Sequence, residues 1–455
     1  SIGANSMTNN SSGFDNTALG RDALNMNTTG SHNTALGSNA LATSVLTSDN
    51  TAVGYNALYF NGSGHHNTAT GSNAMNFTTT GIENVANGAS TLQNNSSGNF
   101  NVAIGMAALQ DNSVGSGNTA VGRYALTNNL SANNNTAIGV QAMETNTIGV
   151  DNTGVGGGCM RSNTTGNSNT ALGMVTLNKN TIGTFNTALG QAGLNGNTEG
   201  NHNTGVGSNS QFANSIGLQN TGVGQGSLIN NTSGSYNVAV GQSSMATNTT
   251  GDFNSALGQS SGWNSAVLDN TTAIGYDAGG AVNDNNRIEI GNTSVSVIAG
   301  QVAFSTYSDM RIKDNVREDV PGLDFINHLR PVTYNLNIHH QNALMRKDVN
   351  ELDWKGKYDI EKIRMTGFLA QEVEDAARNT HYDFSGVQVP ANPNELYSLR
   401  YSDFVVPLVK SVQEVNTKLE SEVSSLKAEI GQLTNENEEL KARLERLEKI
   451  ILEKQ

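Results

Sequence analysis

The chain has 455 residues, enough for two or three domains, and carries a formal net charge of −14 at pH 7. The charges are unevenly distributed: residues 1–300 contain 5 Lys/Arg and 13 Asp/Glu, whereas residues 301–455 contain 20 and 26. Neither part has a basic stripe with interleaved aromatic residues, and no apolar run reaches the roughly 18 residues of a membrane span. We therefore expect a boundary near residue 300, no nucleic-acid partner and no membrane span.

The start of the sequence and its cysteine content narrow the expectations further. The chain lacks an initial Met and begins within a repeat, so we interpret it as a fragment whose upstream part, including any attachment domain, is absent. Cys159 is the only cysteine, which excludes an intrachain disulfide and a cysteine-based zinc site. It occupies a repeat position held elsewhere by Ala, Ser or Thr. A small buried side chain is therefore the favoured interpretation.

Residues 1–287 repeat with a period of 17. The block Asn16–Gly20, with the sequence Asn-Thr-Ala-Leu-Gly, recurs without insertion or deletion, and the sixteenth copy begins at Thr271. The fifth position is Gly in every copy, and the fourth is Leu, Val or Ile in most of them. A second small-then-apolar pair follows, as in Ala23 and Leu24, and then a turn signal rich in Asn, Thr and Gly.

Seventeen residues are too few for a helix pair and suit one turn of a β-solenoid. In such a turn Thr17 and Leu19 share one face of a short strand and Ala18 takes the other. Identical residues then stack at about 4.8 Å and form Asn ladders, so sixteen turns give a rod of roughly 75–80 Å. The alternative is a disordered Asn/Ser/Thr/Gly tract. Disorder gives no reason to keep a 17-residue register, which favours the solenoid.

The repeats carry little apolar bulk, because only Ala, Leu and Val at two positions per turn can form a core. We therefore expect several shafts to associate laterally. Such repeats resemble the β-roll heads of trimeric bacterial adhesins and the fibrous parts of phage tail proteins. The shaft shows no paired carboxylates, His cluster or phosphate loop, so neither glycan cleavage nor a cofactor is expected here.

The register breaks at about residue 288, where a junction or cap is expected over residues 288–307. Ile288–Ile290 and Val295–Ile298 alternate like strands. At the end of this junction, Ser308 and Lys313 lie five residues apart. A Ser-Lys pair is a known form of activated nucleophile, in which a neutral lysine takes the serine proton. By itself the pair is a weak signal, because such residues more often form a solvated turn.

Several further blocks follow in order. They are Ser308-Asp309-x-Arg311-x-Lys313, Gly322-Leu323-x-x-Ile326-x-x-Leu329-x-Pro331, Gly367-Phe368-x-Ala370-Gln371-Glu372 and Leu399-x-Tyr401. This pattern resembles the self-cleaving intramolecular chaperone domain at the C-terminus of phage endosialidases and other tail fibres and tail spikes. The resemblance implies a domain that trimerises the shaft, templates its folding and is then released. It also implies that Ser308 is the nucleophile and Lys313 the base.

We expect the cut at Tyr307–Ser308, because the Ser308 hydroxyl can attack the preceding carbonyl through a five-membered ring. A straight helix or strand does not place residues i and i+5 on one face, so the dyad needs a turn between its members or a lysine from a neighbouring chain. Lys313 must also be neutral, which burial favours.

Two short helices are expected after the dyad, at residues 322–329 and 370–377. The insert at about 337–362 is particular to this chain. His339 and His340 lie in it without carboxylate or Cys partners at ligand spacing, so we expect a solvated loop and no metal site.

The last 50 residues carry one unbroken heptad pattern with Glu and Lys/Arg on the flanks. The a positions are Val409, Asn416, Val423, Ile430, Asn437, Leu444 and Ile451, and the d positions are Val405, Val412, Leu419, Leu426, Leu433, Leu440 and Leu447. A β-branched residue at a with Leu at d favours two strands. The family resemblance implies three, and we expect a parallel trimer because the attached domain and shaft should impose threefold symmetry.

The expected architecture is therefore mainly β. A trimeric β-roll-like solenoid (1–287) and its junction (288–307) precede a small α+β chaperone and autopeptidase domain (308–401) and a parallel coiled coil (402–455). The expected function is that of a homotrimeric phage tail-fibre or tail-spike fragment in the virion tail. A host-surface glycan or receptor is the expected ligand. The alternative is a bacterial adhesin shaft at the cell surface with the same self-processing domain.

Overall fold

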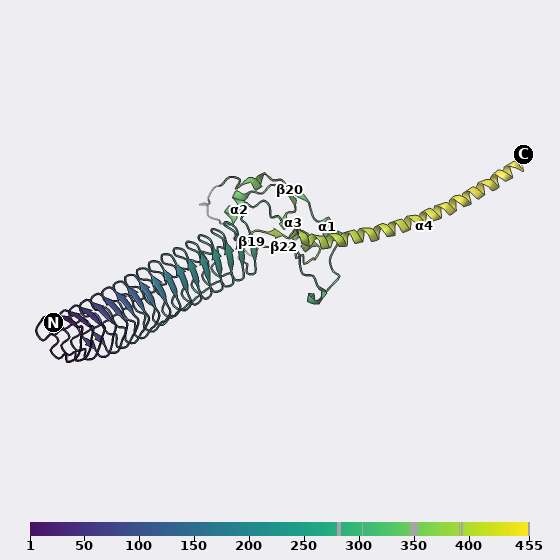
Figure 1. Cartoon of the computed structure of the whole chain (residues 1–455). Helices are drawn as coiled ribbons and strands as arrows, with labels where there is room; N and C mark the ends of the chain where they lie inside the picture. The colour runs from purple at the N-terminus through teal and green to yellow at the C-terminus, as the bar shows by residue number, and fades with distance from the viewer. Residues whose placement is uncertain (280–283, 303, 346–353, 391, 393–394, 454–455) are drawn as a thin grey trace. The chain divides into compact units, whose positions relative to one another are not determined.

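The computed structural model describes residues 1–279, 284–302, 304–345, 354–390, 392 and 395–453. The chain divides into two compact units, Ser1–Asn292 and Thr293–Gln455. The first unit is a stack of similar turns and the second combines a small mixed region with one long helix (Figure 1). The expected solenoid, small α+β region and C-terminal helix are thus confirmed.

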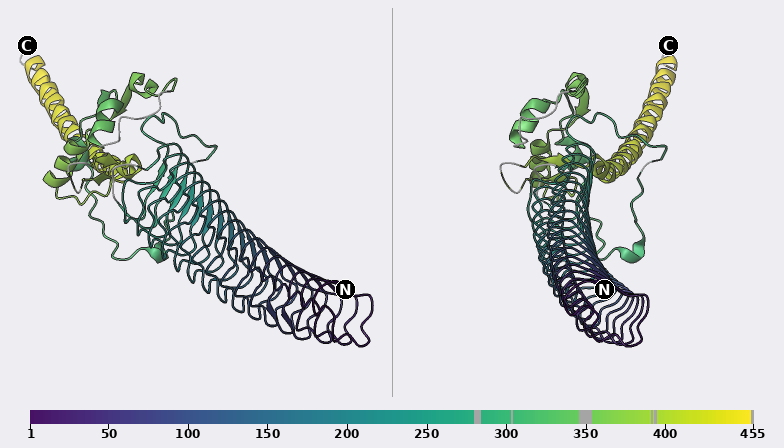
Figure 2. Two further views of the ribbon diagram at one scale, coloured as in Figure 1. Left: turned by 90° about the vertical axis from the view of Figure 1, so that its left-hand side faces the viewer. Right: turned by 60° about the vertical axis from the view of Figure 1, so that its left-hand side comes forward.

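Each turn of the solenoid contributes one three-residue strand to a single parallel sheet, which has 17 strands in the described residues. Figure 2 shows the turns stacked face to face. Neighbouring strands pair in register, for example Thr136 with Thr153. The strands are β1 (Thr17–Leu19), β2 (Thr34–Leu36), β3 (Thr51–Val53), β5 (Thr68–Thr70), β7 (Val85–Asn87), β8 (Val102–Ile104), β9 (Thr119–Val121), β10 (Thr136–Ile138), β11 (Thr153–Val155), β12 (Thr170–Leu172), β13 (Thr187–Leu189), β14 (Thr204–Val206), β15 (Thr221–Val223), β16 (Val238–Val240), β17 (Ser255–Leu257), β18 (Thr272–Ile274) and β19 (Ile288–Ile290). A second parallel pair, β4 (Phe60–Asn61) and β6 (Phe77–Thr78), lies on two neighbouring turns.

The core of the solenoid is narrower than the sequence pattern suggested. Ala18 faces inward and Thr17 and Leu19 face outward, as the alternation of a strand requires. The buried columns are those of Ala18, Ala23 and Leu24. The Leu/Val/Ile column that begins at Leu19, which we expected to help form the core, instead lies on the outer face of the sheet. Its side chains are exposed or half-buried.

Buried asparagines form a ladder at the corner before each main-sheet strand from β2 to β17. Asn152 donates from Nδ2 to the carbonyl of Gly166 (2.9 Å) and to Asn135 Oδ1 (3.1 Å). Its own Oδ1 accepts from the backbone N–H (2.9 Å) and Nδ2 (3.1 Å) of Asn169. Because the amide both donates and accepts, one residue type repeated every turn satisfies the buried backbone of the next turn.

The glycine after each strand is required by the backbone. Gly139 has φ +138°, and a Cβ built there would lie 2.5 Å from the carbonyl oxygen of Gly156 in the next turn. A side chain is therefore excluded both by conformation and by space. This explains why the fifth repeat position is Gly in all sixteen copies.

The break in the repeat near residue 288 is a shortening of one turn. Ile288–Ile290 pairs with β18 in parallel, with Thr272 opposite Ile288, so the spacing is 16 and the sheet continues. The expected strand at Val295–Ile298 is absent, and those residues have no regular secondary structure.

The second unit contains short elements around a small aromatic core. The helices are η1 (Met310–Ile312), α1 (Leu323–Asn327), α2 (Ile338–Leu344), η2 (Asp359–Lys362), α3 (Ala370–Asn379), η3 (Tyr401–Phe404) and α4 (Val405–Leu452). Two antiparallel pairs join β20 (Val332–Tyr334) to β21 (Met365–Gly367) and β22 (Val387–Gln388) to β23 (Ser398–Leu399). The expected helices at 322–329 and 370–377 correspond to α1 and α3. The residues of this core are Phe325, Val373, Ala376, Ala377, Phe384 and Phe404. Of the insert at 337–362, residues 346–353 lie outside the described residues.

Helix α4 runs unbroken for 48 residues. Its apolar heptad side chains are 40–62% exposed from Val409 to Ile451, and both asparagines at a positions are exposed too. These a and d side chains form the seam of α4, and in a single helix the seam is open to solvent.

Candidate functional site

Ser308 and Lys313 are brought together by a single helical turn. The 3₁₀ helix η1 lies between them, and Lys313 Nζ donates to Ser308 Oγ at 2.6 Å. The turn that a five-residue separation requires is therefore present within one chain. This turn is formed by Ser308-Asp309-x-Arg311-x-Lys313, the first block of the pattern that resembles the chaperone domain.

Asp309 and Arg311 stabilise this turn from within. Asp309 caps η1, and its carboxylate accepts from the backbone N–H of Arg311 at 2.8 Å and from the Arg311 guanidinium. The side-chain hydrogen bond and then the backbone bond lower the pKa of Asp309, and the same pair raises the pKa of Arg311. The acidic cap remains ionised at neutral pH and orients the turn that joins nucleophile and base.

The dyad is open to solvent in the single chain. Ser308, Lys313 and the residues between them are all exposed, and the neighbouring Tyr307 is 94% exposed. Ser308 and Lys313 are close enough for proton transfer. Lys313 is not buried, however, and we expected burial to favour its neutral form. One chain alone therefore leaves the dyad unshielded from water.

The histidines of the insert lie in helix α2 and not in the loop that we expected, and His339 has a partner that the sequence spacing concealed. His339 Nδ1 lies 3.0 Å from Glu361 Oε1, and its ring stacks on Tyr358. The hydrogen bond with His339 is the largest cause of a lowered pKa at Glu361. His340 is exposed. Among the described residues, no group of three or more His, Cys, Asp or Glu side chains is arranged to hold a metal ion.

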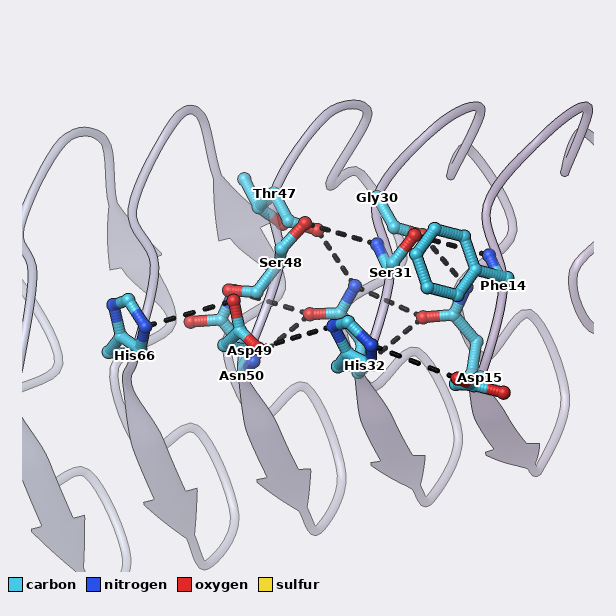
Figure 3. Close-up of polar contacts among 12 residues, drawn as sticks. Phe14, Asp15, Gly30, Ser31, His32, Thr47, Ser48, Asp49, Asn50 and His66 are labelled. Carbon is cyan, nitrogen blue, oxygen red and sulfur yellow. Dashed lines mark hydrogen bonds and ion pairs between the residues drawn. The ribbon is translucent and has the colours of Figure 1, made fainter.

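A column of acidic and basic side chains lies on the first turns of the solenoid (Figure 3). His32 Nδ1 is 3.4 Å from Asp49 and its Nε2 is 3.8 Å from Asp15, while His66 Nε2 is 3.7 Å from Asp49. The sequence was interpreted as lacking a His cluster, but residues 17 apart become neighbours when the turns stack. The repeat period was the signal that could have identified the column. All four side chains are largely exposed, so their ion pairs contribute little to stability.

Cys159 lies in the solenoid core, as its repeat position predicted. Burial raises the pKa of its thiol to about 12. It therefore acts as a small apolar side chain and not as a nucleophile at neutral pH. In the described part of the chain, no helix combines the length and apolar composition needed to cross a membrane.

Comparison with known proteins agrees with the pattern around the dyad. Residues 308–381 match the family model described as the chaperone of endosialidase, a family classed among the peptidases. The match begins at Ser308 and ends before Leu399 and Tyr401, which the resemblance in the sequence had included. No curated protein and no solved structure matches the chain. C-terminal to a long β-solenoid, residues 308–381 are thus similar to the endosialidase-chaperone family.

Proposed function

We propose that this chain is part of a homotrimeric phage tail fibre or tail spike. Its C-terminal domain assembles and aligns three shafts and then cuts itself free at Tyr307–Ser308. The observation that carries the proposal is the 2.6 Å hydrogen bond from Lys313 to Ser308, at the residue where the family match begins. The site of action is the virion tail, and the ligand of the shaft is a host-surface glycan or receptor.

The exposed seam of α4 supports assembly through this helix. A continuous row of apolar a and d side chains on a helix of 48 residues is stable when other copies cover it. Asn437 lies at an a position within the row and restricts the helices to one register. A parallel bundle of three copies would therefore hold all three chains in the same register.

The outer face of the solenoid sheet supports lateral packing of the shafts. Leu19, Leu36, Ile104, Ile138 and Leu172 are each at least 40% exposed and belong to one column along the sheet. Rows of exposed apolar side chains on a sheet face are typical of surfaces that another protein chain covers. In a trimer the three stripes can face one another. Their side chains would then form an apolar core between the chains, in addition to the narrow core inside each shaft.

In the proposed cut, the two side chains of the dyad supply the nucleophile and the base. Ser308 Oγ attacks the carbonyl carbon of Tyr307 while Lys313 Nζ takes the hydroxyl proton. The Tyr307–Ser308 C–N bond breaks, Lys313 returns the proton to the released Ser308 amine, and Tyr307 is left as an ester on Ser308 Oγ. Water then hydrolyses the ester, which frees the Tyr307 carboxylate and the Ser308 hydroxyl.

The test is to express the wild type, Ser308→Ala and Lys313→Ala side by side and to measure intact mass. The wild type should yield a fragment of residues 308–455, and both variants should keep full length. Lys313→Arg should also fail, because arginine does not give up its proton. Ser296→Ala is the matched control, since it removes an exposed hydroxyl from the preceding junction. Normal cleavage by Lys313→Ala would disprove the dyad even if the cut site were right.

The alternative, a bacterial adhesin shaft at the cell surface, rests on the resemblance of the repeats to trimeric adhesin heads. The complete open reading frame distinguishes the two. A virion-binding domain upstream of residue 1 supports the tail protein, and a secretion signal supports the adhesin.

A further inference from the structure

The segment that carries the dyad exposes large apolar side chains. Phe304, Tyr307, Met310 and Ile312 are 93%, 94%, 82% and 65% exposed. None of them belongs to the aromatic core found among the described residues of the second unit. Figure 2 draws this part of the chain as an open teal-green loop with one short helical turn. Four such side chains in nine residues form an apolar surface that water does not favour.

The same unit contains a groove of about 370 Å³ that is lined by uncharged, mostly aromatic and aliphatic residues. Its walls come from β20, the start of α3 and the chain around β23. The lining side chains that matter here are Tyr334, Phe368, Leu369, Tyr397, Leu399 and Tyr401. The volume is at the lower end of the roughly 300–1,000 Å³ range of ligand pockets.

Two of the tyrosine hydroxyls of this groove are engaged in hydrogen bonds within the chain. The Tyr401 hydroxyl accepts from the backbone N–H of Phe368 at 3.1 Å, and the Tyr397 hydroxyl donates to Glu374 at 2.9 Å. None of the residues that line the groove is charged. It presents ring faces and leucine side chains together with the amide of Gln371, so an uncharged segment with aromatic side chains and backbone polar groups suits it.

We propose that the groove of one chain binds the 304–312 segment of a second copy, with the Tyr307 ring as its anchor. The proposal rests on the trimer proposed above and adds the contact that regulates its cut. Tyr401 begins η3, and α4 follows directly at Val405, so the groove is continuous in sequence with the helix that joins the copies. The heptad helices would therefore hold each groove close to the segments of its neighbours.

Each contact would be smaller than a standard interface and would act together with the helical bundle. An aromatic side chain buries roughly 150–250 Å², so Phe304 and Tyr307 together contribute about 300–500 Å² before Met310 and Ile312 are added. A standard interface buries about 800 Å² on each partner. Three equivalent contacts in a trimer would add to the area that the helical bundle buries.

Docking would convert an exposed dyad into a working one. Seating Tyr307 fixes its carbonyl next to Ser308 Oγ and removes water from the Ser308–Lys313 hydrogen bond. Desolvation favours the neutral form of an amine, which is the form that accepts the serine proton. A chain without a neighbour would leave the bond intact, so cleavage would report that assembly has taken place.

The test compares Leu369→Arg in the groove with Ile363→Arg outside it, because both side chains are 42% exposed in the same unit. Native mass spectrometry should find trimers for both. Cleavage should slow at least tenfold in Leu369→Arg and should keep the wild-type rate in Ile363→Arg. Phe304→Asp changes a fully solvated side chain, so it leaves the fold intact and should also slow the cut. Normal cleavage in trimeric Leu369→Arg or Phe304→Asp would overturn the docking contact.

Mixed trimers test whether the contact joins two chains. Chains with Leu369→Arg and an intact dyad are co-expressed with tagged Ser308→Ala chains whose groove is intact. The Leu369→Arg chains should be cleaved in the mixed trimers and not in their own. No rescue in mixed trimers would overturn the interchain contact. Loss of all cleavage in the wild type would instead refute the proposed function itself.

Discussion

Removing one rung of the buried asparagine ladder should loosen the solenoid locally. Asn152→Ala deprives the buried N–H of Asn169 of its acceptor at 2.9 Å. A buried donor left without a partner costs about 1–3 kcal/mol. The substitution also removes three further hydrogen bonds, but their partners, Gly166, Asn135 and Asn169 Nδ2, each keep another hydrogen bond. The loss of each of these three bonds therefore costs only roughly 0.5–1 kcal/mol.

The expected loss is therefore about 2.5–6 kcal/mol, confined to the neighbouring turns because each turn contacts only the next. Native-state hydrogen exchange by mass spectrometry checks it. Peptides covering residues 152–186 should lose that much protection, and peptides around Asn33 should not change. Asn128→Ala, at a half-buried asparagine of the same shaft, is the control. Equal losses in the two variants, or a loss spread over the whole shaft, would refute the reasoning.

Three further outcomes are expected. Gly139→Ala should destabilise the shaft by more than about 1 kcal/mol in urea unfolding, whereas Gly157→Ala, whose Cβ would meet nothing nearer than 3.9 Å, should not. Cys159, with a thiol pKa of about 12, should resist iodoacetamide at pH 8 in the folded chain and react in denaturant; labelling of the folded chain would show that the core is open. Deleting residues 402–455 should give aggregated or misregistered shafts by sedimentation, and soluble native trimers would contradict the role of α4.

The sequence by itself determined the architecture of the shaft. An unbroken 17-residue period can be satisfied only if every turn has the same shape, so the strand at Thr17–Leu19 and the glycine at Gly20 had to recur. The heptads of α4 and the motif around Ser308 were equally local patterns. Each of these features depends on residues that lie close together in the chain, and such patterns can be identified without coordinates.

Tertiary structure decided what depends on residues that meet across turns or across the second unit. The alternation of the strand separates Ala18 from Leu19 but does not say which of them faces inward, and the narrow turn selected the alanine. Likewise, His32 with Asp49 and His339 with Glu361 are neighbours only after folding. The need for a turn between Ser308 and Lys313 was predictable. The 3₁₀ helix capped by Asp309, and the exposure of the dyad in a single chain, follow from the folded backbone, because burial depends on what surrounds a segment and not on its own residues.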